Sequence, residues 1–201
     1  HLAYKVNSKM RCYKMFNKKN TNEFEKSCCF TGYRPEKFPF NLEGESREYT
    51  EFENKLIETV FSLPDEECFT FYSGMAMGFD IIAAETVLLL KKRNPSVKLI
   101  CALPYAGQGI GFPEPWRERH EKILKLADKV IKVSDDYFTG CYAKRNTFMV
   151  DNSDYVVTWF DGKHGGTEST LKYAAKKRRH IINLNDSFDE FSGGFQVSLS
   201  L

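Results

Sequence analysis

The chain has 201 residues, of which 42% are hydrophobic and 28% are charged, and these proportions are ordinary for a soluble globular protein. Its 29 basic residues nearly balance its 27 acidic ones, and the net charge of +2 creates no overall field that would favour nucleic acid or a membrane. No apolar stretch reaches the roughly 18 residues of a membrane span, and the first residues lack the apolar core of a signal peptide. We therefore expect a cytoplasmic protein with no membrane partner, and we do not expect nucleic acid as its ligand.

The six cysteines lack the spacing of a disulfide framework or a zinc site. Cys28 and Cys29 are adjacent in an apparent strand, so their side chains point to opposite faces and cannot readily pair. Cys101 lies within an apolar run, where a thiol behaves as a small hydrophobic group. Because no CxxC or Cys/His ligand spacing occurs, we predict reduced cysteines and no metal site.

Residues 1–25 are polar and rich in Lys and Asn, which predicts a flexible N-terminal extension. From residue 26 onward, short continuous apolar runs alternate with glycine-bearing loops and amphipathic stretches. The six runs span residues 28–30, 69–72, 97–103, 129–133, 155–160 and 181–184. Such runs are typical of strands covered on both faces. We predict an α/β, Rossmann-like domain over residues 26–186, with a mostly parallel sheet of about six strands and helices on both faces, then a tail or edge strand over 187–201.

Three of the amphipathic stretches carry an apolar or small-residue stripe with helical spacing. The stripes pass through Ile81, Ala84 and Leu88, through Trp116, His120, Ile123 and Ala127, and through Thr167, Thr170, Leu171 and Ala174. Trp116 could stack on a nucleotide base, but its place on a stripe favours a position in the core. We also expect Ile81, Leu88, Leu99, Ile100, Val156 and Val157 to be buried.

The loops that follow the predicted strands contain the residues with chemical potential. In an open parallel sheet, ligands bind beyond the C-terminal ends of the strands, and these loops should meet there. The candidate ligand-binding residues are Gly32, Arg34, Ser73, Gly74, Met75, Asp80, Pro104, Tyr105, Arg145, Asn146, Asp161, Gly165, Gly166 and Thr167. Neither His120 nor His164 has an evident partner for acid–base chemistry, so no catalytic residue is assigned.

The chemistry of these loops suits a phosphate-bearing ligand. Gly165, Gly166 and Thr167 precede a helix, where backbone N–H groups can approach a phosphate and Thr167 can cap the helix or bind an oxygen. Arg34 can fork onto a phosphate or form a structural salt bridge, and Asp80 can hold a ribose hydroxyl or merely start a helix. The GxGxxG fingerprint of dinucleotide enzymes is absent, so we expect no resident cofactor.

Several of these segments together resemble a known family. In order, they are residues 31–35, 73–80, 103–105 with Gln108 and Trp116, 140–146, 149–151 and 161–167. This series is similar to the YpsA-like family, also called DUF1273, of the Rossmann-like SLOG superfamily, and the similarity extends over about residues 26–185. SLOG relatives include cytokinin-activating phosphoribohydrolases, the DNA-processing protein DprA and sensor domains for NAD- or ADP-ribose-derived signals. The resemblance implies a ligand pocket in a bacterial or phage protein, but a shared fold does not specify a reaction.

One departure from the phosphoribohydrolases bears on catalysis. Those enzymes carry a Gly-Gly pair, a spacer and a Gly-Thr followed closely by a catalytic Glu, whereas here Glu168 directly follows Thr167. One residue on a helix is a rotation of about 100°, which turns Glu168 away from a ligand held by Thr167. We therefore expect a sensor or carrier of a nucleotide or nucleotide-derived small molecule, such as NAD or ADP-ribose, that is not an enzyme.

Two alternatives and one open question remain. A nucleotide N-glycosidic-bond hydrolase would use Asp80, Glu85 or Glu168 as its acid or base. A DprA-like nucleic-acid module would need a basic face around Arg178. Self-association into a homo-oligomer is left open.

Overall fold

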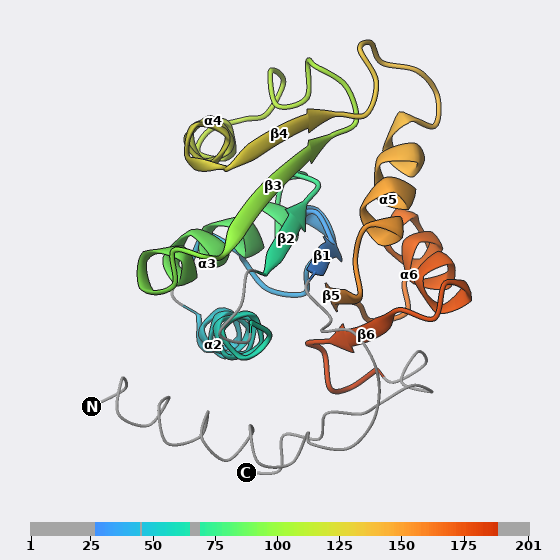
Figure 1. Cartoon of the computed structure of the whole chain (residues 1–201). Coiled ribbons are helices and arrows are strands. Elements are labelled where there is room, and N and C mark those ends of the chain that lie inside the picture. The colour runs from blue at the N-terminus through green and yellow to red at the C-terminus, as the bar shows by residue number, and fades with distance from the viewer. Residues whose placement is uncertain (1–26, 45, 65–68, 189–201) are drawn as a thin grey trace.

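The computed structural model describes residues 27–44, 46–64 and 69–188. Within these residues, six strands form one sheet in which every neighbouring pair is parallel. They are β1 (Ser27–Gly32), β2 (Thr70–Ser73), β3 (Lys98–Leu103), β4 (Lys129–Lys132), β5 (Tyr155–Trp159) and β6 (His180–Asn183). Their order across the sheet is β4-β3-β2-β1-β5-β6 (Figure 1). The predicted α/β fold is confirmed, while the extension expected over 1–25 and most of the tail expected over 187–201 lie outside the described residues.

Helices cover both faces of this sheet, as parallel strands require for their crossover connections. On one face lie α2 (Arg47–Ser62), α3 (Phe79–Arg93) and α4 (Trp116–Leu126), and on the other lie α5 (Cys141–Asp151) and α6 (Gly166–Lys176) (Figure 1). A short 3-10 helix, η1 (Pro35–Lys37), follows β1. Trp116 is buried in the core, as its helical stripe predicts. None of the described helices is long and apolar enough to cross a membrane.

The core is centred on β1, whose Cys28, Cys29 and Phe30 are fully buried. Phe30 stacks on Phe71 of β2 with a distance of 5.7 Å between ring centroids, and it meets Phe79 of α3 edge-on at 6.4 Å. Such pairs add to the free energy of burial through their ring geometry. The buried thiols of β1 are free.

Two residues expected in the core are only partly buried, Leu88 and Ile100. Side chains alternate between the faces of a strand, and Ile100 pairs in register with Tyr72, whose ring packs against Phe148 of α5. Ile100 therefore lies on the α5 face, where it is one strand from the exposed edge strand β4. In α3, the outward stripe passes through Glu85, Leu89 and Lys92, and Leu88 lies at its border.

The contrast between two leucines tests this packing. Leu99 of β3 is fully buried, whereas Leu89 of α3 is 48% exposed. We expect Leu99→Ala to lower the free energy of unfolding by about 2–5 kcal/mol, because it removes apolar contacts and leaves a cavity. Leu89→Ala should change it by no more than about 0.5 kcal/mol. Urea denaturation measures both values, and an equal loss in the two variants would contradict the described fold.

Candidate functional site

The sheet contains one point at which its connections change direction. β1 and β5 are neighbours, with Gly32 in register with Trp159, yet the chain leaves β1 towards α2 and leaves β5 towards α6 on the opposite face (Figure 1). In open α/β sheets, the crevice outside the carboxyl ends of such strands is where ligands bind. The loops after β1 and β5, which the sequence singled out, therefore lie at the favoured position of the fold.

Direct hydrogen bonds hold the loops after β1 and β5 together. The hydroxyl of Tyr33 donates to Oδ1 of Asp161 at 2.7 Å and accepts from the Lys163 N–H at 3.1 Å. The Thr167 hydroxyl donates to the carbonyl of Gly32 at 3.0 Å. Burial, followed by the bond to Asp161, raises the pKa of Tyr33 to about 12, so this hydroxyl keeps the proton that it donates.

The loop after β2 lies at the same edge of the sheet, where it is bonded to the segment after β1. The Phe79 N–H donates to the Tyr33 carbonyl at 3.1 Å. Gly78 has a φ of 86°, and a Cβ there would lie 2.6 Å from that carbonyl oxygen, so only glycine permits this approach. The structure thus brings the segments around residues 31–35, 73–80 and 161–167 to one edge of the sheet.

Seven of the candidate residues are buried at this edge: Ser73, Gly74, Met75, Asp80, Pro104, Arg145 and Thr167. The Ser73 hydroxyl donates to the Asp80 carbonyl at 2.8 Å and accepts from the Met75 N–H at 3.1 Å. Arg145, which is 3% exposed, donates to the carbonyls of Gly74 and Ala102. A Cβ at Gly74 would collide with the Arg145 guanidinium, so this glycine makes room for a buried arginine.

Asp80 and Arg145 are buried groups of opposite charge that act on each other's ionisation. Burial raises the pKa of Asp80 to about 6, against the opposing effect of Arg145 and of the Ala76 N–H. Burial also lowers the pKa of Arg145, and the charge of Asp80 opposes that shift. A buried charge is tolerated only when it is paired and hydrogen-bonded, so we assign this pair to the support of the loops.

Of the candidate residues in the second half of the chain, some hold helices together and others are exposed at the surface. Asn146 accepts from the Arg145 Nε–H at 2.7 Å and donates to the Thr170 hydroxyl at 2.9 Å. Its amide therefore links α5 to α6. By contrast, Gly165 and Gly166 at the start of α6 are exposed. A Cβ at Gly166 would meet no atom within 4 Å, so its backbone is open to a ligand.

Cations lie close to the start of α6. Lys37 Nζ donates to the His164 carbonyl at 3.4 Å, and it would be 3.0 Å from a Cβ at Gly165. Lys163 Nζ lies 2.8 Å from an Asp161 carboxylate oxygen. Lys37 was not among the predicted site residues, because it is the last residue of η1 and only the fold brings it to this helix. Arg34, which was predicted, is exposed on the loop after β1.

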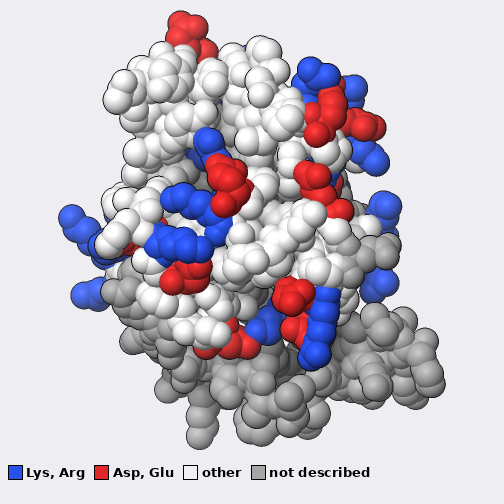
Figure 2. Space-filling model, turned by 180° about the vertical axis from the view of Figure 1, so that it is seen from behind, with Lys and Arg blue, Asp and Glu red and all other residues white. Residues whose placement is uncertain are grey.

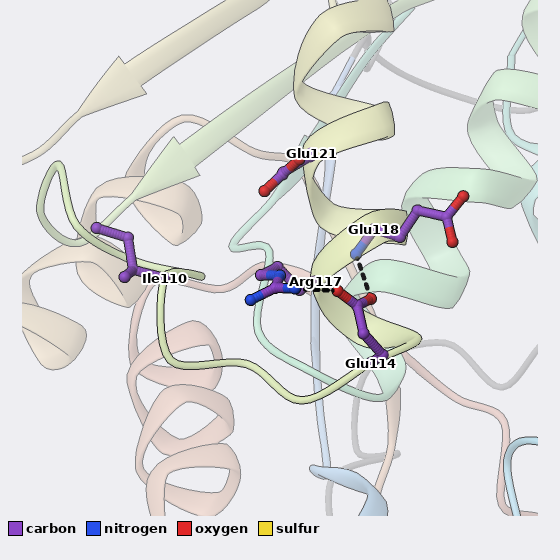
Figure 3. A pocket seen from close by; sticks show the side chains of 5 residues that line it. All are labelled: Ile110, Glu114, Arg117, Glu118 and Glu121. Carbon is purple, nitrogen blue, oxygen red and sulfur yellow. Dashed lines mark hydrogen bonds and ion pairs between the residues drawn. The ribbon is translucent and has the colours of Figure 1, made fainter.

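Two surface hollows lie elsewhere. One, with a volume of about 530 Å³, is lined by Ile110, Glu114, Arg117, Glu118 and Glu121 (Figure 3), and its three carboxylates disfavour an anion. The other, of about 450 Å³, lies between β4 and α5. Neither is lined by a candidate site residue. Basic and acidic side chains also alternate over the face in Figure 2, which presents no broad patch of one sign among its described residues.

The ionisation of Asp80 predicts a pH dependence of stability. Its pKa in the folded state is above the ordinary 3.8, so it favours folding in its protonated form, and that contribution is lost as the pH rises through about 6. The free energy of unfolding of the wild type relative to Asp80→Asn should therefore fall by about 2–3 kcal/mol between about pH 4 and pH 7. Chemical denaturation at several pH values measures this difference.

Asp128 provides a control of opposite sign. Burial opposes its ionisation, but hydrogen bonds from Lys91 and the Leu99 N–H lower its pKa. This contribution is present above the ordinary pKa and is lost as the pH falls through the lowered one. Relative to Asp128→Asn, the wild type should gain stability with rising pH, and the same slope for both variants would contradict the assignment.

Two solved structures of DNA processing protein A share this fold. The protein from Helicobacter pylori, described for its single-stranded DNA binding, matches with a TM-score of 0.51 at 19% identity and covers 79% of this chain and 64% of its own. The Streptococcus pneumoniae protein matches with a TM-score of 0.52 at 13% identity, covering 83% of this chain and 54% of its own. At these identities the likeness extends to the fold alone.

Sequence relatives come from Bacillus. The SPbeta prophage-derived protein YoqJ of Bacillus subtilis is 29% identical over 136 residues, which are 61% of this chain and 80% of that protein. A UPF0398 protein of Bacillus thuringiensis is 30% identical over 118 residues, 58% of this chain and 64% of its own length. The family model described as the YspA SLOG family matches residues 28–186, a range that contains every candidate site residue. The chain therefore belongs to the YspA SLOG family.

Proposed function

We propose that this protein binds a nucleotide or a nucleotide-derived small molecule, such as NAD or ADP-ribose, as a sensor or carrier without turnover. The observation that carries the proposal is the open backbone of Gly166 at the start of α6, beside the point where the sheet connections change direction. The first N–H groups of a helix have no partner within it, and together with the helix dipole they attract a phosphate.

The surroundings of this helix start favour an anion. Gly165 adopts a φ of 152° and a ψ of −159°, a region that is open essentially to glycine alone. No side chain caps the helix at this residue, so the first amides are left to another partner. The ammonium of Lys37 adds positive charge on the β1 side of the site. A phosphate would thus meet backbone donors and a cation at once.

The carboxylates that a hydrolase would need are engaged elsewhere. Glu85 accepts two hydrogen bonds from Arg119, at 2.9 and 2.6 Å. Glu168 contacts Lys172 and His164, and these bonds lower its pKa to about 2. Asp80 has a pKa suited to a general acid, but it is only 5% exposed. A general acid must reach the reacting atom within about 3 Å or through one water, so the geometry favours binding over hydrolysis.

Nucleic acid is the other partner that the fold brings into view, since the Helicobacter pylori neighbour is described for single-stranded DNA binding. For this chain, the net charge of +2 and the mixed charges of Figure 2 favour a small ligand, because non-specific binding to nucleic acid depends on many phosphate contacts. A single-stranded oligonucleotide belongs in the binding assays as a competitor, at two salt concentrations.

Gly166→Val tests the phosphate site. A Cβ at this position meets no protein atom within 4 Å, so the fold should persist, while a bound phosphate would be displaced. We expect calorimetry to show at least a tenfold loss of affinity for ADP-ribose, NAD and AMP, with an unfolding midpoint close to that of the wild type. Gly111→Val is the matched control, because a Cβ at Gly111 also meets nothing within 4 Å. Unchanged affinity in Gly166→Val would remove this helix start from the site.

Glu168→Ala tests the absence of turnover. The purified wild type should release no free base from nucleoside monophosphates and no nicotinamide from NAD above the uncatalysed rate, as chromatography of the products would measure. Any slow residual hydrolysis should survive in Glu168→Ala, because this carboxylate is held by Lys172 and His164. A general acid or base contributes about 10²–10⁴-fold, so a hundredfold loss in the folded variant would reinstate the hydrolase.

A further inference from the structure

Three tyrosines from three segments meet at the same edge of the sheet as the proposed phosphate site. Tyr105 follows β3, Tyr137 follows β4, and Tyr142 lies in the first turn of α5. The ring of Tyr105 meets that of Tyr137 at 5.5 Å and that of Tyr142 at 6.3 Å between centroids, both nearly perpendicular. We call these three residues the tyrosine cluster.

The tyrosine cluster is not part of the core. Tyr137 is 63% exposed, and Tyr105 and Tyr142 are half-buried. The next residue, Phe138, is itself 44% exposed. Aromatic rings gathered at a surface provide flat apolar faces with polar edges, and such faces are a common means of binding another aromatic group. The edge-to-face contacts fix the ring planes without covering all of their faces.

Arg34 connects the tyrosine cluster to the proposed phosphate site. Its Cζ lies 5.9 Å from the centroid of the Tyr142 ring, and its charge acts on both Asp80 and Arg145. Arg34 immediately follows Tyr33, whose hydroxyl contacts the loop that leads to α6. The Arg34 side chain therefore lies beside the tyrosine cluster, while the preceding residue of the same segment contacts the loop that leads to Gly165 and Gly166.

From this arrangement we propose that the tyrosine cluster is the subsite for the heterocyclic base of the ligand, with Arg34 between the base and the phosphate end. The inference rests on the proposed function, and it specifies the class of ligand as nucleotides rather than sugar phosphates. A base stacks on an exposed tyrosine face at the strand ends β3 and β4, while the phosphate lies at the start of α6.

The charged side chains at the two ends of the site support this orientation of the ligand. Asp135 and Asp136 directly precede Tyr137 and are exposed, and they offset the charge of Lys144, whose Nζ lies 5.8 Å from the centroid of the Phe138 ring. This end therefore offers a phosphate no excess of positive charge, whereas the amino groups of a base can donate to a carboxylate. The ammonium of Lys37 lies at the start of α6, where the phosphate is placed.

The experiment compares ligands that differ only in the base. AMP and ribose 5-phosphate are titrated by calorimetry into the wild type, Tyr137→Ala, Tyr142→Ala and the conservative Tyr137→Phe and Tyr142→Phe. We expect the wild type to bind AMP more tightly than ribose 5-phosphate. Each alanine variant should weaken AMP binding by about tenfold, the scale of one lost stacking contact, and should change ribose 5-phosphate binding by no more than about twofold. The phenylalanine variants retain the ring and should retain AMP binding.

Several results would overturn the base subsite. Equal losses for both ligands would make the cluster a structural support of the phosphate site, and unchanged AMP binding would show that its rings do not contact the base. If the wild type dimerised on sedimentation and Tyr137→Ala did not, the cluster would be an interface between copies. Tyr137 is exposed enough that its variants should fold even if Tyr142→Ala does not.

Failure of the two proposals can be told apart. If ribose 5-phosphate binds, is lost in Gly166→Val, and AMP binds no more tightly, the phosphate site stands and the base subsite fails. If the wild type binds neither of these ligands, nor ADP-ribose or NAD, the proposed function fails and the base subsite fails with it. Tyr173→Ala serves as a matched control, because that tyrosine lies on α6 with its hydroxyl bonded to Asp151 and contacts none of the tyrosine cluster in the described structure.

Discussion

The parallel pairing of β1 with β5 is the constraint on which the rest of the site depends. These strands are distant in sequence, yet Gly32 lies in register with Trp159, so their following loops begin at the same height. Because the chain then departs to opposite faces, the loops cannot cover the strand ends completely. The bonds from Tyr33 to Asp161 and from Thr167 to Gly32 hold the two loops in place and leave the first turn of α6 facing outward.

Beneath this edge, a buried arginine supports the loop after β2. The carbonyls of Gly74 and Ala102 accept from the Arg145 guanidinium, and Asp80 supplies the opposite charge. The glycines consequently have different roles. Gly74 makes room for Arg145, and Gly32 makes room for Phe79, whose ring atoms a Cβ would overlap. Gly166 has free space instead, and it is the glycine at which we propose that a phosphate binds.

Membership of the YspA SLOG family and the fold shared with DNA processing protein A establish the scaffold, but a scaffold does not specify chemistry. The proposed function therefore rests on the groups exposed at the strand ends, the backbone of Gly166 first among them. The carboxylates considered for hydrolysis, Asp80, Glu85 and Glu168, are paired or buried, whereas the groups proposed to contact the ligand are backbone amides, cations and aromatic rings. Groups of these kinds recognise phosphates and bases without altering covalent bonds, which is why binding accounts for the site better than hydrolysis.

The sequence by itself determined the six strands, their parallel pairing and the coverage of both sheet faces by helices. It did so because continuous apolar runs that alternate with amphipathic stretches admit few other arrangements. Parallel pairing in turn places the loops after the strands at one edge of the sheet. The sequence also placed Trp116 in the core. The sequence did not distinguish residues that support the loops from residues that are exposed at the surface. Arg145 and Gly74, for example, are 71 residues apart, and nothing local in either segment indicates that the two are in contact. Lys37, the tyrosine cluster and the partial exposure of Ile100 likewise depend on contacts between distant segments. Such contacts, and the burial that follows from them, were decided only by the tertiary structure.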